Sequence, residues 1–296
     1  MKGFLHELRN LGLVLLIPIT AIIQNPTLPT AITAVHGDYS SQIETGGGIR
    51  FLHCVGEGSP TVLLESDTFG MTTGDWRAVQ RQVARFTRVC GYDRANVGQS
   101  SAATGPRAIQ QMADDLASLL RDANVPGPYV LVSFGFGALV DRLYASQHPD
   151  DIAGIVLIDP VSEELEARWQ ALIPSELWAQ RASTLWQGNP EQIAFDESFA
   201  QMRAADPLPD VPTIVLVHDP ASLGAGLIPA SWPASALEPV WQELVAAQAA
   251  RFPGGVLIVA RSCGHEIVAG APDKVVWAIR SVVWPPLTPV IGNSMG

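Results

Sequence analysis

Positive charge is scarce in this chain. Its 296 residues include 18 Lys and Arg against 29 Asp and Glu, a formal net charge of −11. A protein that binds nucleic acid needs a basic surface to pair with phosphates, and no Lys or Arg cluster is present. The composition therefore argues against nucleic acid as a partner. Hydrophobic content of 47% with 8 Trp is ample for the core of a globular body.

Cysteine is also scarce. The three cysteines, Cys54, Cys90 and Cys263, show neither a CxxC pair nor the spacing of metal ligands. The sequence thus predicts no metal site and no cofactor. Cys54 and Cys90 fall in expected strands, and we expect them to be buried free thiols rather than a disulfide or a reactive pair.

An apolar run near the N-terminus extends from Leu11 to Ile23. A membrane-spanning helix needs about 20 apolar residues, whereas the core of a signal peptide has about 7 to 15. The run predicts export or attachment to a membrane, as a cleaved signal or a retained anchor. Residues 1–45 are expected to hold this element and an extended linker, and residues 46–296 the folded domain.

Apolar runs and helical patterns alternate beyond the linker. This alternation is typical of a mostly parallel sheet with helices on both faces. Strands are expected at 49–54, 61–65, 87–92, 129–133, 155–159, 213–218 and 255–260, and helices at 75–86, 109–123, 138–147, 237–251 and 272–283. Residues 162–206 interrupt the rhythm with Trp-rich helical segments, which could roof an apolar pocket.

A series of short motifs appears in a characteristic order. The motifs are Gly56-Glu57-Gly58-Ser59-Pro60, Asp75-Trp76, Tyr92-Asp93-Arg94, Gly127-Pro128-Tyr129, Arg142-Leu143-Tyr144 and Gly264-His265. With them, the chain from about Gly46 to Val283 resembles the α/β-hydrolase superfamily, particularly its small bacterial esterase-like members. The resemblance implies an α/β-hydrolase fold in which residues 162–206 stand where a lid is inserted.

The nucleophile of that superfamily stands on a sharp strand-to-helix turn with the pattern Gly-x-Ser-x-Gly. Here the three marked positions carry Ser133, Gly135 and Gly137, so the turn is kept while the attacking oxygen is missing. Shifting the motif to make Ser133 the nucleophile would bury its hydroxyl in the strand. We expect a degenerate site at Gly135, with Ser133, Phe134 and Phe136 beside the pocket.

The resemblance also implies a histidine and an acid after the elbow. His265 follows the last expected strand and matches the family histidine. Asp219 is the carboxylate nearest to the usual position of the acid, and Asp159, which closes the preceding strand, is the alternative. A carboxylate in either place is also an ordinary turn residue.

The loop after the strand 61–65 departs from the family as well. Where the resembling enzymes have a glycine-rich oxyanion loop, this chain has Asp67, Thr68 and Phe69. An inward-pointing Asp67 would repel the negative charge that an oxyanion hole stabilises.

Three hypotheses remain. The first, which we favour, is a non-catalytic protein, attached to a membrane or exported, that binds a protein partner or an apolar ligand. The second is an enzyme without a cofactor that uses His265 as a general base. The third is an ordinary esterase-like hydrolase with Ser133 as its nucleophile. We expect Gly135→Ser to be sterically acceptable and still insufficient to create an efficient esterase.

Overall fold

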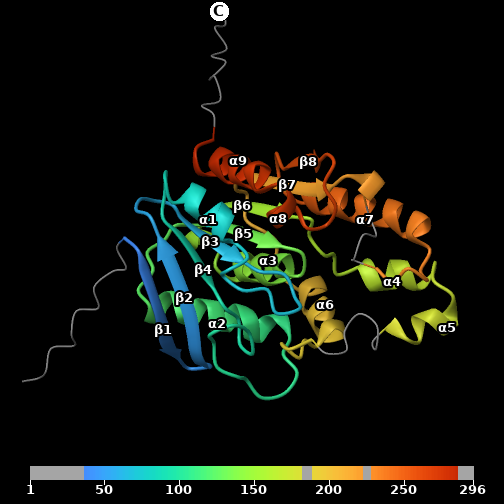
Figure 1. Ribbon diagram of the computed structural model, residues 1–296, viewed down its shortest axis with the longest axis horizontal. Helices are drawn as coiled ribbons and strands as arrows, with labels where there is room; N and C mark the ends of the chain where they lie inside the picture. Colours follow the sequence, from blue (N-terminus) through green and yellow to red (C-terminus); the bar gives the residue numbers. More distant parts are fainter. Residues whose placement is uncertain (1–36, 182–188, 223–227, 286–296) are drawn as a thin grey trace, which may run out of the picture. The chain divides into compact units, whose positions relative to one another are not determined.

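A central β-sheet organises the computed structural model, which describes residues 37–181, 189–222 and 228–285 (Figure 1). Within these residues the sheet has eight strands in the order β1-β2-β4-β3-β5-β6-β7-β8. β2 runs antiparallel to β1 and β4, and the remaining pairs are parallel. The strands are β1 (Tyr39–Thr45), β2 (Gly48–Val55), β3 (Thr61–Glu65), β4 (Val89–Tyr92), β5 (Tyr129–Phe134), β6 (Ile152–Ile158), β7 (Thr213–His218) and β8 (Val256–Ala260).

Helices cover both faces of the sheet. α1, α8 and α9 pack against one face, and α2, α3 and α7 pack against the other. The helices are α1 (Arg77–Val83), α2 (Ile109–Asp122), α3 (Gly137–Gln147), α4 (Leu165–Gln170), α5 (Ser175–Trp178), α6 (Phe195–Arg203), α7 (Ala234–Ala249), α8 (Ile267–Gly270) and α9 (Pro272–Val283). The predicted α/β-hydrolase architecture, a mostly parallel sheet between helical layers, is confirmed.

The alternation of side chains along β5 explains why both layers are needed. Val130 and Val132 belong to one hydrophobic core and Leu131 to the other, and all three are fully buried. Successive strand residues point to opposite faces, so a continuous apolar run must be covered on both sides. This packing holds the carboxyl end of β5 in place, where the elbow begins.

The sheet starts earlier than the sequence indicated. Residues Tyr39–Thr45, expected to be part of a linker, form β1 and pair with β2 along their whole length. Their burial alternates between exposed and half-buried, so this edge strand is largely polar and lacks the apolar signal of a central strand. The apolar run Leu11 to Ile23 lies outside the described residues. None of the helices within the described ranges is long and apolar enough to cross a membrane.

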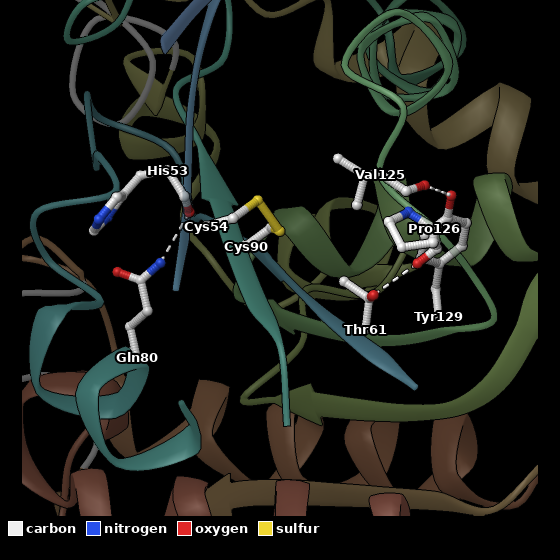
Figure 2. The surroundings of a disulfide bond; sticks show 8 residues. All are labelled: His53, Cys54, Thr61, Gln80, Cys90, Val125, Pro126 and Tyr129. Atoms are coloured by element: carbon white, nitrogen blue, oxygen red, sulfur yellow. Dashed lines mark hydrogen bonds between the residues drawn. A yellow bond between two sulfur atoms is a disulfide. The ribbon is translucent and has the colours of Figure 1, made fainter. Parts of the chain in front are cut away.

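Cys54 of β2 and Cys90 of β4 form a disulfide (Figure 2). The antiparallel register places the two residues directly opposite each other, with their Cα atoms 4.0 Å apart. The expectation of two free thiols was therefore wrong, because the pairing of β2 with β4 could not be read from the strand positions alone. Cys263 is buried with a free thiol.

The expected helical interruption lies between β6 and β7. It contains α4, α5 and α6, and its buried aromatic residues pack against the main body. Trp169 of α4 contacts Trp241 of α7, with their ring centroids 5.8 Å apart. Residues 162–206 supply half of the residues that line the cavity described below.

Candidate functional site

Gly135 forms a tight turn between β5 and α3. Its φ of +54° lies in the left-handed region, where glycine has no Cβ penalty. Its N–H donates to the carbonyl of Ile158 at 3.0 Å, and its carbonyl accepts from the N–H of Val161 at 2.9 Å. The strand, the turn and the helix thus form the sharp turn that the sequence indicated, with glycine at its tip.

The Asp67 carboxylate occupies the space that a side chain at Gly135 would need. A Cβ built on Gly135 would lie closer than 3.0 Å to the carboxylate carbon and both oxygens. Gly135→Ser, which we expected to be sterically acceptable, therefore requires the Asp67 carboxylate to move. Asp67 points inward and accepts a hydrogen bond from the backbone N–H of Phe136 at 2.7 Å. That N–H follows the elbow and is the donor that this fold aims at a developing oxyanion.

His265 joins Asp67 to a second carboxylate. Its Nε2 lies 3.2 Å from Oδ2 of Asp67, and its Nδ1 lies 2.6 Å from Oδ2 of Asp159. His265 comes from the segment between β8 and α8, and Asp159 directly follows β6. Parallel strands bring these carboxyl ends to one edge of the sheet, which is the usual location of sites in α/β folds.

The row of charged side chains continues beyond Asp159. Nδ1 of His218 lies 2.8 Å from Oδ2 of Asp159, and Nε2 of His218 lies 3.0 Å from Oε2 of Glu238. Asp159 also accepts from the indole N–H of Trp241 at 3.0 Å. Carboxylates and imidazoles therefore alternate through Asp67, His265, Asp159, His218 and Glu238.

The contacts between these side chains determine their ionisation. Burial tends to lower the pKa of His265, but hydrogen bonds and attraction from Asp159 and Asp67 raise it to about 10. Burial tends to raise the pKa of Asp159, and its contacts with His218 and His265 outweigh burial and lower it to about 2. The pKa of Asp67 is likewise lowered by His265 and nearby backbone N–H groups, against the effect of burial. At neutral pH an imidazolium is held between two carboxylates.

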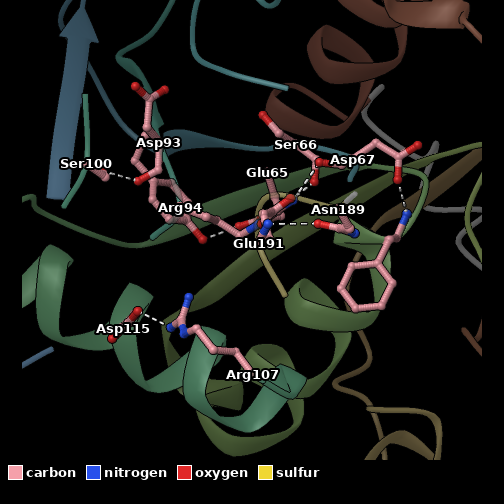
Figure 3. A network of polar contacts seen from close by, with 12 residues as sticks. Glu65, Ser66, Asp67, Asp93, Arg94, Ser100, Arg107, Asp115, Asn189 and Glu191 are labelled. Carbon is pink, nitrogen blue, oxygen red and sulfur yellow. Dashed lines mark hydrogen bonds and ion pairs between the residues drawn. The ribbon is translucent and has the colours of Figure 1, made fainter. Parts of the chain in front are cut away.

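A second polar cluster lies beneath the loop that carries Asp67 (Figure 3). The guanidinium of Arg94 donates to the backbone carbonyls of Ser66 and Asp67, each at 2.5 Å. It also binds Glu65 at the end of β3, and Glu191 of the insertion through two hydrogen bonds. Arg94 thereby joins the insertion, the sheet and the Asp67 loop in one buried cluster.

An apolar cavity opens beside the Asp67 carboxylate. The cavity has a volume of about 60 Å³. The residues lining it are Asp67, Thr68, Phe136, Val161, Leu165, Glu166, Trp169, Trp178, Phe195, Phe199, Trp241 and His265. Aromatic rings from α4, α5, α6 and α7 thus enclose a small space that ends on an ion pair.

Several residues predicted for the site lie elsewhere. The Asp219 carboxylate does not pair with His265, since it accepts from the N–H groups of Ser262 and Ala221 in an exposed turn. The structure brings Asp159, the alternative acid, to His265. Phe69 is 57% exposed, and with Phe134 it lines a surface depression that shares Asp67 and Thr68 with the cavity. The Phe134 ring also packs against the imidazole of His265, with their centroids 4.8 Å apart.

Three predicted pocket residues, Asp67, Thr68 and Phe136, do line the cavity, and Ser133 does not. Ser133 is fully buried in β5 beneath the elbow. A hydroxyl in that position cannot meet a substrate, which agrees with the expectation that shifting the motif would bury it.

No role was predicted from the sequence for His218, Glu238, Arg94 or Glu191. His218 closes β7 in the same way that Asp159 closes β6, so its position at a strand end was a usable signal. Arg94 stands in one of the motifs quoted for the family resemblance. Glu191 carried no local signal, because its partner Arg94 lies 97 residues away.

Comparisons with known proteins agree with this architecture. A family model described as "alpha/beta hydrolase fold" matches residues 60–202. The chain is 32% identical over 108 residues to the uncharacterized protein YqjL of Bacillus subtilis, covering 36% of this chain and 42% of YqjL. It is 28% identical over 109 residues to an uncharacterized vacuolar membrane protein of Saccharomyces cerevisiae, covering 36% of this chain and 17% of the yeast protein.

A solved structure extends the likeness over most of the chain. A thermophilic esterase from Thermogutta terrifontis matches with a TM-score of 0.58 at 21% identity, over 82% of this chain and 97% of the esterase. At that identity the match shows the fold alone. The family model matches just under half of the chain, and the described residues have the α/β-hydrolase fold. The sequence alignments span less than half the length of the two relatives named above.

Proposed function

We propose that this chain is a non-catalytic α/β-hydrolase-fold protein that binds a small apolar ligand in the cavity beside Asp67. The observation that carries the proposal is the position of the Asp67 carboxylate. It fills the space of the missing nucleophile and accepts the hydrogen bond of the Phe136 N–H. An acyl substrate would find neither an attacking oxygen nor a vacant donor for its oxyanion.

The protonation of His265 favours the same reading over general-base catalysis. A general base must be free to accept a proton at the working pH. With its pKa raised to about 10 by Asp159 and Asp67, against the effect of burial, His265 carries its proton at neutral pH. Because of this geometry, His265 acts as the cation that holds Asp67 in place.

A serine-directed fluorophosphonate probe tests the catalytic half of the proposal. These reagents need a hydroxyl activated by a base, so we expect no labelling of the purified protein at neutral pH. Intact-mass spectrometry measures the result, with an active serine hydrolase as the positive control. Stoichiometric labelling of Ser133 would contradict the proposal and favour an ordinary hydrolase.

Titration with methylenecyclopentane, followed by ¹H–¹⁵N spectra of the tryptophan indoles, tests the binding half. We expect saturable shifts of the indoles that line the cavity, Trp169, Trp178 and Trp241. Leu165→Trp should fill the cavity and abolish these shifts while the protein still unfolds cooperatively. Identical shifts in that variant would place the binding elsewhere.

We also propose that the protein works outside the cytoplasm or on a membrane. The apolar run Leu11 to Ile23 supports this location, and so does the Cys54–Cys90 disulfide, since disulfides persist in oxidising compartments. The yeast relative is a vacuolar membrane protein. Fractionation of cells treated with a thiol-alkylating reagent tests the location. Soluble cytosolic protein with Cys54 and Cys90 alkylated would refute it.

A second candidate function follows from the same carboxylate. An ionised Asp67 beside an apolar cavity could attack a saturated carbon of an alkyl halide, forming an ester bond while the halide leaves with the bonding electron pair. Water would then hydrolyse the ester. Incubation with 1-bromobutane distinguishes this function: a butyl ester on Asp67, retained in Asp219→Asn and lost in Asp67→Asn, would establish it. Unmodified protein without bromide release would favour the binding protein.

A further inference from the structure

Two tryptophan rings are exposed on α9. Trp277 is 52% exposed, and Trp284, which directly follows the helix, is 50% exposed. The spacing of seven residues, two helical turns, places both rings on one side of the helix. Other tryptophans of the described residues are buried, namely Trp76, Trp169, Trp232 and Trp241. Two large apolar rings on one exposed side mark a surface that contacts something other than water.

A row of arginines lies on the neighbouring helix α1. Arg77 and Arg81 belong to this helix and Arg85 to the turn that follows it, and all three are exposed. Residues four apart lie on the same side of a helix, so the fold gathers charges that the sequence spreads out. None of the three forms a salt bridge with another described residue. Residues 76–92 include no acidic residue, although the whole chain has a net charge of −11.

The tryptophans and the arginines belong to one surface, because α1 and α9 lie side by side (Figure 1). The ring centroids of Phe86, in the turn after α1, and Trp284 are 5.2 Å apart. The guanidinium of Arg280 lies 5.8 Å from the Phe86 centroid and 5.4 Å from that of Trp284. Gln82 of α1 donates to Asp273, the acidic residue of α9, at 3.0 Å. We call these exposed tryptophans and arginines the α1–α9 surface.

We propose that the α1–α9 surface binds an anionic phospholipid bilayer. Tryptophan rings are amphipathic and are enriched where a membrane meets water. Each arginine close to an anionic membrane strengthens binding by about fivefold. A bilayer satisfies both halves of the surface, since its headgroups pair with the guanidinium groups and its acyl chains receive the rings. This inference rests on the proposed location on a membrane and names the surface and the lipid charge that hold the folded domain there.

Quenching of tryptophan fluorescence by lipids brominated on their acyl chains tests this contact on the full-length protein. The sequence has no tryptophan before Trp76, so insertion of the run Leu11 to Ile23 alone leaves the tryptophans outside the bilayer. We expect quenching with vesicles that contain phosphatidylglycerol, and little with vesicles of phosphatidylcholine alone. Combining Trp277→Phe with Trp284→Phe should remove most of the quenching, because the remaining rings do not enter the bilayer.

A charge variant, Arg81→Gln combined with Arg85→Gln, tests the role of the arginines. We expect its quenching to fall to the level seen with phosphatidylcholine alone, since two arginines together contribute about 25-fold to binding. The matched control combines Arg121→Gln with Arg168→Gln, which removes two arginines from α2 and α4 and should preserve the quenching.

Sedimentation with the same vesicles separates this contact from the proposed location. If the wild type sediments with anionic vesicles and its tryptophans are not quenched, the α1–α9 surface is refuted while the attachment to a membrane stands. Equal loss of quenching in the charge variant and its control would also refute the surface. If the protein sediments with neither kind of vesicle, the membrane attachment fails together with the surface.

Discussion

Two buried charged clusters meet at Asp67, and they differ in the cation that each contains. Arg94 holds the backbone of Asp67 and binds Glu65 and Glu191. His265 holds the side chain of Asp67 and binds Asp159. A guanidinium keeps its charge at every accessible pH, whereas an imidazolium can lose its proton. The first cluster therefore sets where Asp67 lies, and the second sets the charge around it.

The two clusters at Asp67 suggest a reason for the glycine at position 135. If the site had simply decayed, there would be no reason for its remaining parts to be fully paired. Instead the glycine at the elbow makes room for Asp67, and Asp67 satisfies both His265 and the Phe136 N–H. Two departures from the family, at positions 67 and 135, thus fit together as one arrangement.

Replacing Arg94 with Met should produce the largest effect. The change leaves Glu65 and Glu191 buried without their cation, and breaking a buried ion pair in this way costs about 3–5 kcal/mol of folding free energy. Urea denaturation followed by fluorescence measures the loss. The matched control is Arg168→Met, which breaks a surface pair with Glu243 and should leave stability unchanged. Equal losses in the two variants would show that the Arg94 cluster has no special role.

Gly135→Ser should have an intermediate effect. Its side chain collides with Asp67 and places a non-glycine residue at a φ of +54°, which together cost about 1–3 kcal/mol. We expect no esterase activity from this variant. Adding Asp67→Gly removes the collision, so the double variant should be more stable than the sum of the single changes predicts. A His265-dependent esterase activity in the single variant would refute the view that Asp67 blocks the site.

The fold could be predicted from the sequence because its signals are local. Apolar runs such as Ile214 to Val217 are sufficient to mark buried parallel strands, and glycine at positions 135 and 137 marks the elbow. The first strand was missed because β1 is polar at the edge of the sheet, where no continuous apolar run is required.

The site could be predicted only in part, because its contacts join distant segments. Asp67 meets the N–H of Phe136 across 69 residues and His265 across 198. Asp159 and Asp219 each stand just after a strand, and only the arrangement of β6, β7 and the His265 segment decides between them. Likewise, the Cys54–Cys90 disulfide depends on the register between β2 and β4.

Raising the pH should destabilise the His265 cluster and leave the charge of Arg94 unchanged. For each pH unit, this is the smallest of the expected changes in stability. A histidine whose pKa is raised in the folded state stabilises the protein fully below its unfolded pKa of about 6.5, and this contribution disappears as the pH rises through the folded value. For His265 that value is about 10, so its stabilisation should decline from pH 6.5 to about 10 by at most about 1.4 kcal/mol per pH unit. The guanidinium of Arg94 keeps its charge over this range and contributes no such slope.

Nuclear magnetic resonance of ¹⁵N-labelled imidazole measures this titration directly, beside urea denaturation at each pH. Asp67→Asn removes one of the two carboxylates that hold His265 and should shift its titration to lower pH, while Asp219→Asn, at a carboxylate that pairs with the backbone of Ser262 and Ala221 instead, should not. On the acid side, stability should fall as Asp159 is protonated between about pH 4 and its folded pKa of about 2. If His265 titrates near pH 6.5 in the wild type, the imidazole is not held between two carboxylates, and the closed arrangement around Asp67 is refuted.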